Sequence, residues 1–186
     1  MTTFWIIVAV AALFGVAVVV IYNRLVKSRQ MVSEAWSGID VQLKRRTDLI
    51  PNLVETVKGY AGHERETLQR VTELRNQAQA MPRDDVAGRA QVEGLLSQAL
   101  GRLLAVAEAY PDLKASTNFS ELQGALREVE EALQYARRYY NGAVRNLNVL
   151  VEQFPSNLVA NQFGFSQAEY FEIEDASERA VPKVAF

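Results

Sequence analysis

The sequence contains no cysteine and only one histidine, His63, and the scarcity of these residues limits the chemistry that the protein can perform. Without cysteine there are no disulfides, no thiolate nucleophile and no cysteine-based zinc site. A lone imidazole beside Glu64 and Glu66 lacks the repeated spacing of metal ligands, and no nucleophile or orienting partner accompanies it. We therefore expect no metal site, no cofactor and no enzymatic activity.

The chain also lacks a large excess of positive or negative charge. Twenty lysines and arginines stand against 22 aspartates and glutamates, so the formal net charge is −2. This balance lacks the basic footprint of a nucleic-acid-binding protein, and we expect no nucleic-acid partner. Proline is scarce, and because it interrupts helices its positions divide the chain. The five prolines are Pro51, Pro82, Pro111, Pro155 and Pro182.

A long uncharged run is present at the N-terminus, from Phe4 to Tyr22, and it contains no proline. As a helix rising 1.5 Å per residue, it matches the ~30 Å hydrocarbon core of a bilayer. Trp5 and Tyr22 stand near its two ends, where amphipathic rings favour the headgroup level. A cleaved signal peptide is the alternative, but the leader is only three residues long and no small-residue cleavage site follows. Within the run, Ala11 and Gly15 form one small-xxx-small step, which permits close approach of a second helix.

The flanks of this run set its expected orientation. Arg24, Lys27 and Arg29 follow it before the first acidic residue, and nothing basic but the terminal amine precedes it. The positive-inside rule then predicts a single-pass protein with its N-terminus outside and its bulk in the cytoplasm. The three cations either set topology alone or also contact anionic lipid headgroups, at up to about 1 kcal/mol each.

Beyond the anchor, apolar residues recur at alternating steps of three and four. The clearest seam covers residues 119–154, a second covers about 82–110, and a third continues from the anchor through Leu25 to Leu43. Such seams are buried against neighbouring helices. The sequence therefore predicts long helices joined by short connections.

Pro51 decides where the first of these helices ends. A proline costs about 3 kcal/mol in a helix interior but is tolerated in a first turn. We therefore predict a chain reversal at residues 44–51 and a second helix over about 48–80, with one kinked helix as the alternative. The predicted fold is all-α: an N-terminal transmembrane helix continuing into an antiparallel four-helix bundle with long helices. The predicted domains are residues 1–23 (anchor), 24–155 (bundle) and 156–186 (aromatic and acidic tail, mobile from Glu172).

Two sets of residues are candidate contact surfaces. The first is polar and is placed by the predicted reversal at the distal tip of the bundle, either as a docking surface for a protein partner or as helix capping with solvated charge. The second is aromatic and either mediates self-association or packs on its own bundle. The polar set is Asp40, Lys44, Arg45, Arg46, Asp48 and Asn52, and the aromatic set is Trp36, Phe163, Phe165, Tyr170 and Phe171.

Several ordered motifs resemble those of the LemA family. They are Ala35-Trp36, IDVQLKRR at 39–46, DLIPNLV at 48–54, VKGYA at 57–61, YPDLKA at 110–115, FSELQ at 119–123, RRYYN at 137–141 and FPSN at 154–157. The resemblance implies a bacterial membrane protein with one N-terminal span, a helical bundle and no established activity. Some relatives take part in magnetosome membrane formation, which favours a role in assembly or membrane organisation.

These inferences lead to two functional hypotheses. The first is a non-enzymatic helical scaffold, anchored in the bacterial inner membrane, that self-associates into a closed homo-oligomer and organises membrane or partner proteins. The alternative is a signalling or envelope-stress adaptor that recruits a partner through its distal charged tip.

Overall fold

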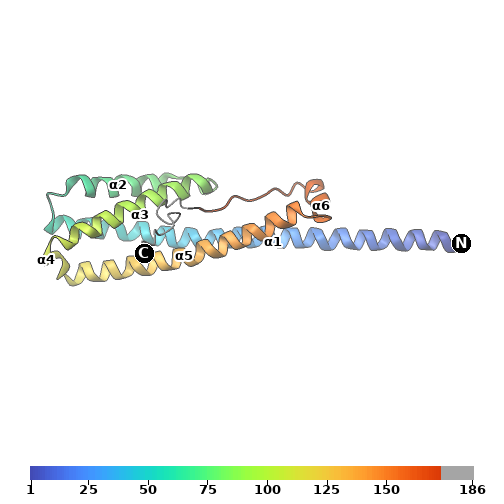
Figure 1. Cartoon of the computed structure of the whole chain (residues 1–186), viewed down its shortest axis with the longest axis horizontal. Helices are drawn as coiled ribbons and strands as arrows, with labels where there is room; N and C mark the ends of the chain where they lie inside the picture. The colour runs from blue at the N-terminus through green and yellow to red at the C-terminus, as the bar shows by residue number, and fades with distance from the viewer. Residues whose placement is uncertain (173–186) are drawn as a thin grey trace, which may run out of the picture. The chain divides into compact units, whose positions relative to one another are not determined.

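The computed structural model describes residues 1–172, and within this range it contains six helices and no strand. This confirms the all-α class and the helical bundle (Figure 1). The predicted mobile segment lies outside the described residues from position 173 onward. The helices are α1 (Thr2–Tyr60), α2 (Arg65–Ala80), α3 (Val86–Glu108), α4 (Pro111–Lys114), α5 (Thr117–Glu152) and α6 (Ser156–Gln162).

The chain forms two compact units, and each is described by itself. The anchor unit comprises residues 1–39 and 136–169, and the bundle unit comprises residues 40–135 with the described residues 170–172. α1 and α5 each contribute residues to both units.

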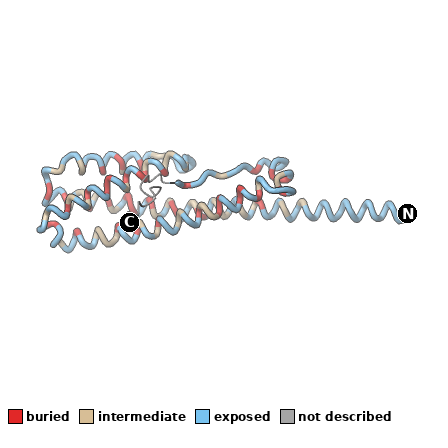
Figure 2. The backbone as a smooth tube through the Cα atoms, in the orientation of Figure 1, coloured by how far each residue is buried: buried red, intermediate tan, exposed pale blue. Residues whose placement is uncertain are grey.

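One apolar cluster forms the core of the bundle unit and draws on α1, α2, α3, α4 and α5. Burial of apolar surface is the main favourable term in such a core, at about 25 cal/mol per Å². The red segments along these helices in Figure 2 mark the buried residues. The seams predicted for the two C-terminal long helices are buried at Leu96, Ala99 and Leu103 in α3 and at Leu126, Val129 and Leu133 in α5.

The first helix is longer than predicted. α1 continues through Pro51 to Tyr60, so the chain reversal predicted at residues 44–51 is wrong, and one uninterrupted helix takes its place. The reversal lies instead at residues 61–64, before α2 begins at Arg65. Residues 44–51 therefore occupy the interior of α1 and no bundle tip.

The hydrogen bonds around Pro51 explain this continuity. Proline has no backbone N–H, so the carbonyl of Thr47, four residues earlier, loses its helical donor. Nε of Arg75 in α2 donates to this carbonyl at 3.1 Å. A tertiary hydrogen bond thus replaces the one that Pro51 removes.

Arg75→Met removes this donor and leaves the Thr47 carbonyl unpaired in the protein. We expect it to lower the free energy of unfolding by about 1–3 kcal/mol, and by clearly less in a Pro51→Ala background, where the introduced alanine supplies the missing backbone N–H. Circular dichroism during denaturant unfolding of the detergent-solubilised chain measures both values.

Arg70→Met is the matched control, because Arg70 also lies on α2 and its ion pair with Glu73, at 3.7 Å, is exposed. We expect this change to stay within about 0.5 kcal/mol. An Arg75→Met cost that is equal with and without Pro51 contradicts the assigned role of the hydrogen bond.

Candidate functional site

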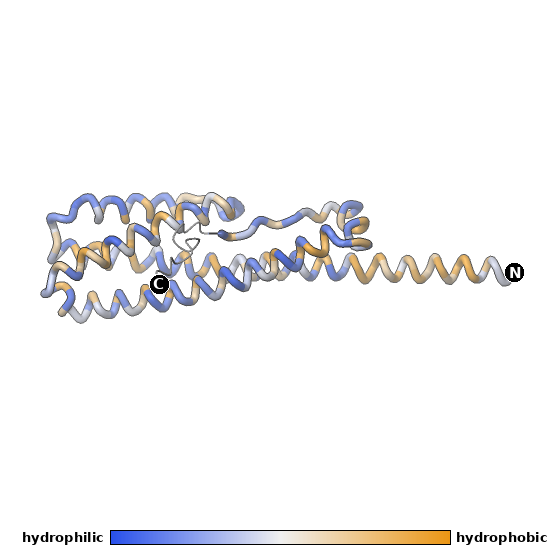
Figure 3. Tube along the Cα trace, viewed as in Figure 1, coloured by the Kyte–Doolittle hydropathy of each residue, from blue (hydrophilic) through white to orange (hydrophobic). Residues whose placement is uncertain are grey.

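Among the described residues, α1 is the one helix long and apolar enough to cross a membrane. The apolar core helix of a soluble protein is buried, whereas none of the apolar stretch near the N-terminus of α1 is buried by the rest of the chain. Figure 3 shows this stretch as an almost continuous hydrophobic segment, and residues 1–17, which include Phe4 and Trp5, are exposed. An apolar surface of this extent is typical of contact with lipid.

The predicted small-residue step lies on this exposed stretch. A Cβ placed on Gly15 meets no atom within 4 Å, so the chain itself leaves this face open. Ala11 is exposed one turn earlier. The pair is therefore available to a helix from another molecule.

The end of the apolar run is joined to the C-terminal aromatics. The ring of Tyr22 lies 5.0 Å from that of Phe163 and 5.8 Å from that of Phe165, both edge-on. The guanidinium of Arg29 stands 4.9 Å above the Phe165 ring, within range of a cation–π interaction. Arg24 and Lys27 are exposed. Tyr22 was predicted as an anchor residue, Arg29 as a headgroup cation, and Phe163 and Phe165 as self-association contacts. In the structure these four residues form one cluster.

A tight turn brings the chain back onto α1 after α6. Gly164 has φ +70°, a conformation that favours glycine, and N–H of Phe165 donates to the carbonyl of Ala160 at 2.9 Å. Phe165 is buried as a result, and Phe171 is buried as well. The interpretation of these two residues as self-association contacts is therefore corrected, since both side chains are enclosed by their own chain. Phe163 and Tyr170 stay exposed.

The segment that follows is held against α5. Asn148 makes two hydrogen bonds with the backbone of Ala168: its Nδ2 donates to the carbonyl at 3.0 Å, and its Oδ1 accepts from N–H at 2.9 Å. The hydroxyl of Tyr140 donates to the carbonyl of Glu169 at 2.9 Å, and the ring of Trp36 packs 5.3 Å from the Tyr140 ring. Burial, with the Glu169 carboxylate adding to it, raises the pKa of Tyr140, so the hydroxyl keeps its proton at physiological pH.

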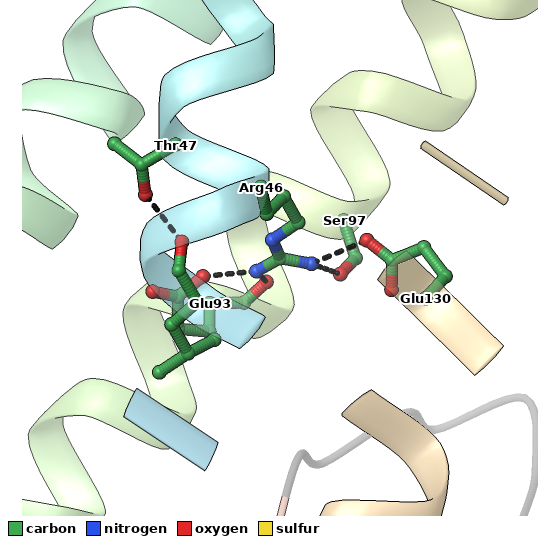
Figure 4. A network of polar contacts seen from close by, with 6 residues as sticks. Arg46, Thr47, Glu93, Ser97 and Glu130 are labelled. Carbon is green, nitrogen blue, oxygen red and sulfur yellow. Dashed lines mark hydrogen bonds and ion pairs between the residues drawn. The ribbon is translucent and has the colours of Figure 1, made fainter. Parts of the chain in front are cut away.

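The bundle unit contains a buried ionic network around Arg46 (Figure 4). Nη1 donates to Oε1 of Glu130 and to Oγ of Ser97, each at 2.7 Å. Nη2 donates to a carboxylate oxygen of Glu93 and to its carbonyl oxygen, the latter at 3.3 Å. Arg46 is 0% and Glu93 2% exposed.

The two glutamates of this network keep the guanidinium of Arg46 positively charged. Burial opposes the charged guanidinium, but Glu93 and Glu130 outweigh burial and raise the pKa of Arg46. Small residues on α3, Ala90 and Gly94, flank Glu93 and are buried with it. This ionic network joins α1, α3 and α5 and leaves no room for a substrate to reach the guanidinium.

The remaining polar candidates divide into bonded and exposed residues. Asp40 forms ion pairs with Arg89 at 2.8 Å and with Arg83 at 3.5 Å. Lys44 and Asp48 pair on the surface of α1 at 3.0 Å. The side chains still available to a partner are Lys44, Arg45, Asp48 and Asn52. Arg46 is withdrawn from the predicted docking surface, because its guanidinium is buried and both terminal nitrogens donate to groups inside the bundle unit.

Sequence reasoning missed Glu93, Ser97 and Glu130 as partners of Arg46. The run Lys44-Arg45-Arg46 suggests solvated charge, although only its third residue faces inward. The available signal was on α3, where Ala90, Gly94 and Ser97 place small side chains on one helical face around a glutamate. Within residues 1–172 no group of three acidic, histidine or cysteine residues is placed to hold a metal.

Arg46→Met leaves Glu93 buried without its cation, and we expect the free energy of unfolding to fall by about 3–5 kcal/mol. A second change, Glu93→Met, should restore much of this loss because it removes the unpaired charge. Denaturant unfolding of the single and double variants measures both effects. Arg45→Met is the matched control, since the neighbouring guanidinium is exposed, and equal losses for the two single variants contradict the structural role of Arg46.

The chain is similar to magnetosome proteins and to a LemA protein. Two magnetosome proteins, MamQ 2 of Paramagnetospirillum magneticum and MamQ of Magnetospirillum gryphiswaldense, are 26% and 24% identical to this chain, over 86% of it and 68% of their own length. Protein LemA of Metamycoplasma hominis is 24% identical over 82% of this chain and 69% of its own. The LemA family model matches residues 35–186, from Ala35 in α1 to the C-terminus. The chain therefore belongs to the LemA family.

Proposed function

We propose that this protein is a non-enzymatic scaffold that is anchored in a membrane by α1 and self-associates there. The observation that carries the proposal is the continuity of α1. One helix of 59 residues contains both the apolar run and the residues that organise the bundle core, with no loop between them.

The ion pairs within the bundle unit favour a structural role over a catalytic one. Arg46, Glu93 and Asp40 are engaged in ion pairs that join helices of the bundle unit. A catalytic group needs access to a reacting atom and a suitably placed partner. The buried ion pair of Arg46 and Glu93 offers no such access.

The flanking charges support a topology for the proposed scaffold. Arg24, Lys27 and Arg29 follow the apolar run directly, and Arg24 and Lys27 are exposed there. We propose that the N-terminus lies outside and the remaining chain in the cytoplasm of a bacterial inner membrane. The names of the MamQ relatives, which identify them as magnetosome proteins, favour a role in organising a membrane.

The open face at Ala11 and Gly15 is the proposed contact between copies. Helices pack closely in membranes where small residues let their backbones approach. Oligomers of identical chains normally close by symmetry, so the proposed product is a closed homo-oligomer.

Gly15→Ile fills this face, and we expect it to weaken self-association at least about tenfold, or ~1.4 kcal/mol per contact. Mass photometry in mild detergent, over a concentration series, reports the change as a shift toward the monomer. Ala17→Ile is the matched control: at about 3.6 residues per turn it lies on the opposite face of the same helix. A monomer for the unmodified chain at micromolar concentration, or equal masses for the two variants, contradicts the proposal.

A second candidate is an adaptor that recruits a protein partner through the bundle unit. A groove of about 280 Å³ favours it, because its lining includes the charged residues Asp40, Lys44, Asp48 and Arg83. Charged grooves of this kind give specificity to protein contacts.

Reversal of the exposed charges tests the adaptor. Lys44→Glu with Arg45→Glu should reduce crosslinking to that partner in native membranes at least tenfold and leave oligomer mass unchanged. Arg127→Glu, an exposed position on α5, is the control. Undiminished crosslinking by the double variant contradicts the adaptor.

A further inference from the structure

The anchor unit presents an apolar surface that its own packing leaves uncovered. α6 buries one side, with Val159 and Ala160, in a cluster shared with Leu25, Leu147 and Leu150. On the opposite side Leu158 is exposed together with the uncharged Asn161 and Gln162, and two exposed phenylalanines flank the helix. Phe154 is 78%, Leu158 61% and Phe163 53% exposed.

The position of this surface along α1 is fixed by contacts. Phe163 touches Tyr22, the last residue of the uncharged run. Val18 and Ile21, which belong to that run, pack against the same cluster as Val159 and Ala160. The helix rises about 6 Å over the four residues from Val18 to Tyr22. The cluster that packs against α6 therefore extends about one helical turn into the uncharged run.

The composition of the segment is unusual for a surface. Residues 153–168 contain no charged residue, although charged residues make up 23% of the chain. A solvated loop and short helix normally carry charge, whereas this stretch exposes two phenylalanines and a leucine. Apolar groups of this kind are stabilised at the boundary of headgroups and acyl chains, about 5–10 Å deep.

We propose that α6, with Phe154, Leu158 and Phe163, is a second membrane contact that inserts into the lipid interface beside the end of the span. The occupant is the bilayer, because the surface is continuous with a helix stretch that itself requires lipid. Arg24 and Lys27, exposed just beyond Tyr22, then face the headgroups of the same leaflet. The inference rests on insertion of α1 in a bilayer.

The absence of cysteine makes a site-specific test possible. Leu158→Cys in the full chain is labelled with an environment-sensitive fluorophore and reconstituted in vesicles of phosphatidylcholine and phosphatidylglycerol. Vesicles with doxyl-labelled acyl chains act as the quencher. We expect blue-shifted emission and at least twofold quenching by shallow doxyl groups. Circular dichroism verifies that the labelled chain stays helical.

Two further positions separate the possible failures. Ser33→Cys, exposed on α1 about 16 Å beyond Tyr22 at 1.5 Å per residue, should show water-like emission without quenching. Leu13→Cys, in the middle of the run, should be quenched by deep doxyl groups. Loss of quenching at Leu13 overturns the anchor itself.

Quenching at Leu13 without quenching at Leu158 overturns the interfacial contact alone. Emission at Leu158 can also be blue-shifted without being quenched by doxyl lipids. If this blue shift increases with protein density, a second copy of the chain covers the surface, which also overturns the proposal.

Discussion

α1 stays helical across Pro51 because a side chain on α2 donates the hydrogen bond that the proline cannot donate. The Thr47 carbonyl accepts from Arg75 at 3.1 Å, and the neighbouring Arg46 is buried, paired with the buried Glu93 and the partly exposed Glu130. Both arginine contacts are made at one level of α1. Arg75 lies on α2 and Glu93 on α3, so these contacts join both helices to adjacent residues of α1. A tertiary arrangement here overrides a local preference of about 3 kcal/mol against proline in a helix interior.

The longest seams were predictable because they depend only on local spacing. The second seam was predicted from about residue 82, and α3 begins at Val86, where Asp85 caps it by accepting from N–H of Gly88 at 2.8 Å. α5 buries most apolar positions of the seam predicted over 119–154, whereas Phe154 at its end lies beyond α5 and is exposed. The reversal was not predictable from Pro51, because the decisive donor, Arg75, lies 28 residues after Thr47 and on another helix.

The candidate site was predictable only in part, for a similar reason. Phe163 and Phe165 were identified by their aromatic character, but their contacts with Tyr22 depend on the packing of α6 and, for Phe165, on the turn at Gly164. Arg46 lies in a basic run that is typical of solvated charge, and its burial depends on a glutamate 47 residues later. A second readable signal that went unused is the uncharged stretch at 153–168, which marks a surface suited to lipid.

The distance between Val41 and Lys58 tests the continuity of α1 most directly. Both residues are exposed, belong to the bundle unit and flank Pro51, and the chain has no native cysteine to interfere. Spin labels on Val41→Cys and Lys58→Cys, measured by double electron–electron resonance in lipid, should lie about 25 Å apart along a helix rising 1.5 Å per residue. A chain reversal near Pro51 brings the two positions side by side, at the ~10 Å that separates packed helices, and such a short distance contradicts the account.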